Sequence, residues 1–196
     1  VGALPATLNN LTVSGTDNNA ALEATFGATG QTITVNNSTL GGNASTITFG
    51  AFATQTATTG AANDIFNTIA VDGITANGGI GNDTFNVTAV AALNDNDGVL
   101  ITLNGGTGTD VLTLADGLVG TIDFTDTSDI SLTSIETLNL GVVGTVAAGA
   151  ETLAVTLPTG FTTITGTTDT NENIAITATA AQIDELPRVT SLVAKG

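Results

Sequence analysis

Short runs in which apolar residues alternate with threonine recur along the chain, each bounded by Gly, Asn or Asp. The clearest are TITVN (32–36), STITF (45–49), VLITL (99–103), VLTL (111–114), TIDFT (121–125), ISLT (130–133), ETLNL (136–140), TLAVTL (152–157), FTTITG (161–166) and NIAITAT (173–179). A period of two, with many β-branched residues and turn residues at both ends, is typical of half-buried β-strands. The pattern therefore predicts an all-β protein.

The runs are spaced by roughly 8–12 residues, which indicates a sandwich, a barrel or a solenoid. Helical patterns are few. The segments 88–97 and 180–187 are each long enough for a short turn of helix, and Pro187 would end the second. We expect little helix in the fold.

Two glycine-rich stretches, GGIGNDTFN (78–86) and GGTGTDVLT (105–113), share the pattern G-G-x-G-x-D-x-U-x, in which U is a large apolar residue. This pattern is that of calcium-binding β-roll repeats. Glycine permits positive φ, so that backbone carbonyls can turn toward an ion, and aspartate adds a charged oxygen. Ca²⁺ takes six to eight oxygen ligands, which two adjacent turns can supply together. The predicted metal-site residues are Gly78, Gly79, Gly81, Asp83, Gly105, Gly106, Gly108 and Asp110.

Two further stretches resemble these turns in part. TGAANDIFN (59–67) keeps the Asn-Asp-x-Phe-Asn portion, which adds Asp64 to the predicted site, and it has Ala61 and Ala62 in place of Ile80 and Gly81. LNDNDG (93–98) supplies Asp95 and Asp97 in another oxygen-rich turn. The alternative is that all of these are plain hairpin turns, which Asn-Asp and Gly-Gly also favour.

Charge and composition narrow the function classes. The 196 residues carry 18 acids and two bases, Arg188 and Lys195, for a net charge of −16, and 41% of them are hydrophobic. Such a surface suits divalent cations and repels nucleic acid. The chain has no His, Cys, Trp or Tyr, which excludes disulfides, ordinary zinc sites and His-dependent nucleophilic catalysis. We expect no enzyme activity, and no apolar run is long enough to span a membrane.

GGIGNDTFN and GGTGTDVLT resemble the RTX calcium-binding repeats, and TSIETLNL (133–140) with its neighbouring strands is similar to Thr-rich repeats of bacterial surface-layer (S-layer) proteins. The resemblance implies a β-solenoid or β-roll with Ca²⁺-binding turns. It also implies an extracellular lattice or filament subunit at the cell surface, partnered by copies of itself, with a cell-surface glycan as a second candidate. A calcium-binding adhesin module and the secretion domain of a larger RTX protein are the alternatives.

We expect three segments, 1–58, 59–140 and 141–196, in one continuous domain or separate subdomains, with β-sandwich packing of the outer two left open. Asp123, Asp126 and Asp129 recur every three residues, as a further calcium site or as solvated loop acids. Glu136 is expected at an outward strand position or as an edge charge, with a ligand role as the alternative. Thr-x-Thr pairs at 32–34, 46–48, 54–56, 107–109, 125–127 and 177–179 are reminiscent of ice-binding solenoids. Because no fixed repeat length aligns them, ordinary strand propensity is the favoured explanation.

Overall fold

The computed structural model describes residues 2–15, 22–37, 43–90, 93, 99–115, 118, 120–140, 151–165 and 172–177. Within these ranges the chain is nearly all β, and every strand pairing is parallel. The predicted all-β class is confirmed. No helix in the described part of the chain is long and apolar enough to cross a membrane.

The strands belong to three sheets. The six-stranded sheet has the order β1 (Asn10–Gly15), β3 (Thr32–Asn37), β5 (Gln55–Thr58), β7 (Ile74–Ile80), β9 (Ile101–Thr107) and β12 (Ile130–Thr133). The seven-stranded sheet has the order β2 (Glu23–Thr25), β4 (Thr46–Thr48), β6 (Ile65–Ile69), β8 (Thr84–Val87), β10 (Val111–Leu114), β13 (Thr137–Asn139) and β15 (Thr163–Thr165). The third sheet contains β11 (Gly120–Asp123), β14 (Glu151–Thr156) and β16 (Glu172–Thr177).

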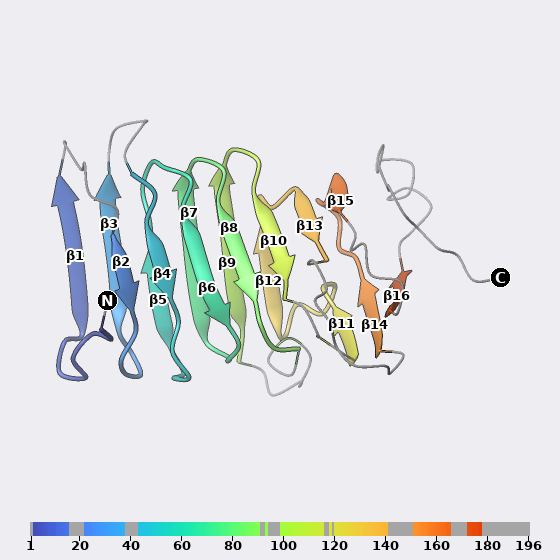
Figure 1. The fold of residues 1–196 in the computed structure, drawn as a ribbon, viewed down its shortest axis with the longest axis horizontal. Coiled ribbons are helices and arrows are strands. Elements are labelled where there is room, and N and C mark those ends of the chain that lie inside the picture. Colours follow the sequence, from blue (N-terminus) through green and yellow to red (C-terminus); the bar gives the residue numbers. More distant parts are fainter. Residues whose placement is uncertain are drawn as a thin grey trace.

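The chain alternates between the two long sheets, so that each strand of the six-stranded sheet is followed by one of the seven-stranded sheet (Figure 1). We call such a pair a unit, for example β7 with β8. Each unit lies beside the previous one, with strands in register apart from a shift between Phe66 and Ile69 in β6. The chain passes from the six-stranded sheet to the seven-stranded sheet on one side of the molecule, which we call the ladder edge. It passes back to the six-stranded sheet on the opposite side, which we call the return edge.

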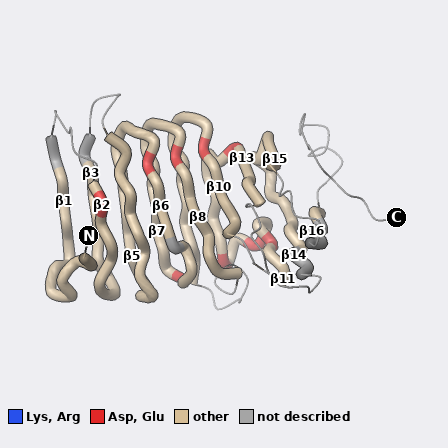
Figure 2. Tube along the Cα trace, viewed as in Figure 1, with Lys and Arg blue, Asp and Glu red and all other residues tan. Residues whose placement is uncertain are grey.

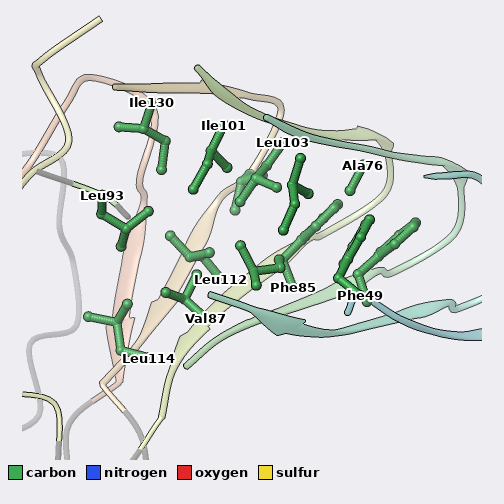
Figure 3. Close-up of a cluster of buried hydrophobic side chains, with 14 of the residues drawn as sticks. Phe49, Ala76, Phe85, Val87, Leu93, Ile101, Leu103, Leu112, Leu114 and Ile130 are labelled. Carbon is green, nitrogen blue, oxygen red and sulfur yellow. The ribbon is translucent and has the colours of Figure 1, made fainter. Parts of the chain in front are cut away.

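The core fills the space between the two long sheets (Figure 3). Inward residues alternate with outward ones along each strand, as in β8, where Phe85 and Val87 are buried and Thr84 and Asn86 are not. Four phenylalanines stack across the first units, with ring centroids 5.2, 6.4 and 4.9 Å apart for the successive pairs of Phe26, Phe49, Phe66 and Phe85. Leu112 continues from Phe85 in register. Similar apolar side chains at equivalent inward positions of successive units pack against one another, and this packing stabilises the alignment of the units.

The structure differs from the sequence pattern in where the glycines lie. The pattern placed Gly78, Gly79, Gly105 and Gly106 in turns, but they lie within β7 and β9, where Gly79 pairs with Gly106. Glycine therefore extends these strands to the ladder edge instead of ending them. The seven-stranded sheet takes strands from all three predicted segments, while residues 180–187 and most of 88–97 lie outside the described residues.

Two buried glutamines brace the return edge. The Gln31 amide accepts from the backbone N–H groups of Gly27 and Ala28 and donates to the carbonyls of Pro5 and Leu8. Gln55 repeats this role, because its Oε1 accepts from the Gly50 N–H at 2.9 Å and its Nε2 donates to the carbonyls of Gly50 and Phe52. Each glutamine side chain thus forms hydrogen bonds with backbone N–H and carbonyl groups of the turn. A buried apolar side chain would leave these groups unpaired.

We expect Gln55→Ala to lower the free energy of unfolding by about 2 kcal/mol, because it leaves buried backbone groups without partners. The matched control is Thr56→Ala at the next, outward position, where the expected loss is within about 1 kcal/mol. Urea unfolding of both variants measures the difference. Equal losses would show that the glutamine does not brace the turn.

Candidate functional site: a ladder of buried acids

Four acidic residues line up along the ladder edge. Asp64, Asp83, Asp110 and Glu136 each directly precede a strand of the seven-stranded sheet, and those strands pair so that Ile65, Thr84, Val111 and Thr137 are in register. Figure 2 shows the acids side by side along this edge. We call the four residues the acid ladder.

Backbone hydrogen bonds join the acids of the ladder. Oδ1 of Asp83 accepts from the backbone N–H of Asp64 at 2.7 Å, and Oδ1 of Asp110 accepts from the N–H of Asp83 at 2.7 Å. The series continues at both ends, from the Ser45 N–H to Asp64 and from the Asp110 N–H to Oε2 of Glu136, at 2.5 and 2.9 Å. Each carboxylate therefore fastens one unit to the unit before it, whether the chain between them is 19, 27 or 26 residues long.

Three of the four ladder carboxylates are buried. Asp83 and Asp110 have no solvent-exposed surface and Asp64 is 2% exposed. Because Oδ1 is taken up by the backbone, only Oδ2 is left, and the Oδ2 atoms of Asp83 and Asp110 have no hydrogen-bond partner. Burying an ionised carboxylate oxygen without a hydrogen-bond partner is unfavourable in free energy. A proton or a bound cation at these two atoms would remove that penalty.

The first glycine of each motif makes room for the ladder carboxylate. A β-carbon at Gly78 would collide with Oδ2 of Asp83 and would come within 2.8 Å of the Gly105 carbonyl oxygen. A β-carbon at Gly105 would likewise meet Oδ2 of Asp110 and the Ser134 carbonyl oxygen. The free carboxylate oxygen and a carbonyl oxygen of the following unit therefore lie against the same glycine.

The other glycines hold a backbone shape that few residues adopt. Gly79 and Gly81 have φ of 99° and 140°, and Gly106 and Gly108 repeat these values closely at 96° and 147°. The repeated conformation stacks one unit on the next, and β-carbons at Gly106 and Gly108 would meet the carbonyl oxygens of Gly79 and Gly81. The glycines are needed both for φ and for the close approach of two backbones.

Burial raises the pKa of Asp83 from its ordinary value of 3.8 to about 7, and the carboxylates of Asp64 and Asp110 add to the rise. The pKa values of Asp64 and Asp110 are raised for the same main reason, although backbone hydrogen bonds oppose the shift. The ladder therefore favours either protonation or a compensating positive charge near neutral pH.

The ladder edge offers oxygen atoms that are suitable ligands for Ca²⁺. The free Oδ2 atoms and the adjacent carbonyls are hard oxygen ligands of the type that Ca²⁺ takes. Among the described residues, however, no three acidic side chains gather around one point that could hold an ion. An ion at the ladder edge would therefore be held by Asp83 or Asp110 together with backbone carbonyls such as those of Gly105 and Ser134.

The partial motif TGAANDIFN (59–67) aligns in the structure with GGIGNDTFN (78–86), as their sequences predict. Ala61 forms a bridge with Ile80, and Asp64 stands one unit before Asp83. An outer row of asparagines accompanies the acids, since Oδ1 of Asn63 accepts from the Asn82 N–H and Oδ1 of Asn82 from the Thr109 N–H. Asp95 and Asp97 lie outside the described residues.

Glu136 is the ladder member that the pattern did not place there. It was expected at an outward strand position. It lies in the turn directly before β13 and is half-buried, and its longer side chain reaches the Asp110 N–H. The available signal was the run Glu136-Thr137-Leu138, which repeats the acid and apolar spacing of Asp110-Val111-Leu112.

The acids at 123–129 serve local turns. Oδ1 of Asp123 accepts from the N–H and hydroxyl of Thr125, and Oδ1 of Asp126 accepts from those of Ser128. The hydrogen bonds from Ser128 hold the pKa of Asp126 below its ordinary value. These contacts favour the loop-acid interpretation for Asp123 and Asp126.

No protein-family model, no curated protein and no solved structure matches this chain.

Proposed function

We propose that the chain is a self-assembling structural protein of the bacterial cell surface, a subunit of a surface layer or a related filament. Its paired units form a β-solenoid that Ca²⁺ folds and joins. The observation that carries the proposal is the acid ladder, in which the free carboxylate oxygens of Asp83 and Asp110 lie close to backbone carbonyls along one edge.

The ladder gives calcium a way to control folding. Without a cation, folding at neutral pH buries Asp64, Asp83 and Asp110 in successive units, which opposes the stacking of units. Bound Ca²⁺ would supply the missing positive charge, and its binding free energy would add to folding because the unfolded chain has no such site. The chain would then be most stable where calcium is abundant, as it is outside the cell.

Assembly would use the sheets themselves. Within the described residues, β1 is one of the two edge strands of the six-stranded sheet, and it presents backbone groups of the kind that a strand from a second copy can pair with. The parallel register gives such an addition a fixed direction. Copies of this chain are therefore the proposed partners.

The test is a calcium titration from EGTA-containing buffer, followed by chemical unfolding and negative-stain electron microscopy. We expect Ca²⁺ at about 100 times its Kd to raise the free energy of unfolding by about 3 kcal/mol and to produce ordered sheets or filaments. Asp83→Asn should lose most of the response. The matched control is Asp126→Asn, which makes the same change in an exposed turn and should respond like the parent.

Two results would count against the proposal in different ways. A stability that does not respond to Ca²⁺ would refute the calcium site. A calcium response without polymers would refute self-assembly and favour an adhesin module or a secretion domain of a larger protein.

A further inference from the structure

The outer face of the six-stranded sheet carries a regular array of small polar side chains. Its outward positions fall into two columns that follow the strand register from β1 to β12. The first column is Asn10, Thr32, Thr56, Thr75, Thr102 and Ser131, and the second is Thr12, Thr34, Thr58, Asn77, Asn104 and Thr133. We call these twelve residues the outer array.

The array exists because the strands stay in register although the units differ in length. No fixed repeat length in the sequence aligns the Thr-x-Thr pairs, and some of these pairs, such as 125–127, lie in turns. The pairing nevertheless sets Thr32 beside Thr56, Thr56 beside Thr75 and Thr75 beside Thr102. Variation in chain length is absorbed outside the strands, so it does not disturb the columns.

The array is periodic in two directions. Neighbouring strands lie about 4.8 Å apart, and outward residues two apart on one strand are separated by about 6.6 Å. The strands of the sheet run side by side in one direction (Figure 1). Threonine is β-branched and stiff at χ1, so its hydroxyl and methyl groups keep defined positions. The Asn77 amide adds order by donating to Thr58 Oγ1 at 3.4 Å.

The outer array lacks charged, aromatic and large apolar side chains, which proteins and sugars commonly use as binding contacts. No strand of this sheet contains an Asp, Glu, Lys or Arg, although the chain carries a net charge of −16. In Figure 2 the acids lie mainly at the edges of the long sheets. None of the twelve positions has an aromatic or large apolar side chain to anchor a protein or to stack on a sugar ring. What fits is a neutral surface that repeats hydrogen-bonding groups in two dimensions.

We propose that the outer array binds ice. The oxygen atoms of ice form a neutral two-dimensional repeat on each crystal plane, and the array offers hydroxyl, amide and methyl groups in a repeat of similar scale. Each contact is weak, but many are made together, and the side chains are already ordered before binding. A crystalline polysaccharide also repeats hydroxyls, but the absence of aromatic rings on the array makes ice the better match.

The experiment is ice shaping and thermal hysteresis of the purified full chain in calcium-containing buffer, with folding verified by circular dichroism. We expect faceted crystals and a measurable gap between melting and freezing. Thr75→Tyr, at the centre of the array, should abolish most of this activity, because the ring lifts the flat face away from the crystal. The matched control is Thr84→Tyr, the same change on the outer face of the seven-stranded sheet, which should keep the activity.

Several outcomes would overturn the proposal. A folded parent chain that leaves ice crystals as rounded as in buffer would refute it, as would equal loss in the two tyrosine variants. Sedimentation with microcrystalline chitin or cellulose in the absence of ice shaping would reassign the array to polysaccharide. None of these outcomes bears on the calcium response, so this inference fails or stands apart from the proposed function.

Discussion

In calcium-free buffer the free energy of unfolding should fall as the pH rises from about 4 to about 7, and Asp83 should account for about 4 kcal/mol of the fall. Burial raises the pKa of Asp83 to about 7 in the folded chain, against 3.8 as its ordinary value. Between these values the folded state holds a proton that the unfolded state has released, so raising the pH favours unfolding.

The measurement is urea unfolding at several pH values in EGTA, with Asp83→Asn as the comparison. Asparagine keeps an oxygen for the Asp64 N–H and carries no charge, so the variant should be more stable than the parent near pH 8 and should show a flatter pH profile. A parent chain whose stability increases from pH 5 to pH 8 would contradict the prediction. It would mean that the buried carboxylate is stabilised as an anion.

Gly106→Ala should lower the free energy of unfolding by about 3 kcal/mol or more, combining a cost for positive φ with one for overpacking. Gly106 has φ of 96°, and a β-carbon there would collide with the backbone of Gly79 in the preceding unit. Backbone atoms cannot turn aside as the end of a flexible side chain can, so two units would have to separate locally.

The control for this substitution is Gly30→Ala. Gly30 has a similar φ of 76° but nothing within 4 Å of its would-be β-carbon, so the expected loss there is about 1 kcal/mol. Equilibrium unfolding of both variants separates backbone strain from collision between units. Equal losses would show that the stacking at Gly106 is looser than the structure has it.

The sequence pattern predicted those strands in which branched apolar residues alternate with threonine, such as Thr32–Asn37 and Val111–Leu114. It missed strands whose inward positions are small or polar. In β5 the inward residues are Gln55 and Ala57, and in β7 the outer end is Gly78-Gly79. Only the neighbouring units make these segments strands, because the parallel ladder supplies hydrogen bonds that local propensity does not predict.

The acids of the candidate site were predictable because Asp64, Asp83 and Asp110 share a local motif. Their relation to one another was not. The bond from each backbone N–H to the next carboxylate spans 19 to 27 residues, and no local pattern encodes it. The outer array could not be predicted for the same reason, since its columns depend on register and not on repeat length.

From β6 to β10, the differences in length between units lie at the return edge. The turn from β7 to β8 and the turn from β9 to β10 both take three residues, whereas the return from β8 to β9 takes far more than the return from β6 to β7. Over these units the ladder edge therefore keeps its geometry, while the return edge accepts added sequence. If the proposed filament forms, peptide tags, epitopes or whole modules grafted at the return edge would be displayed along it at regular intervals. The ladder that joins the units would be left untouched.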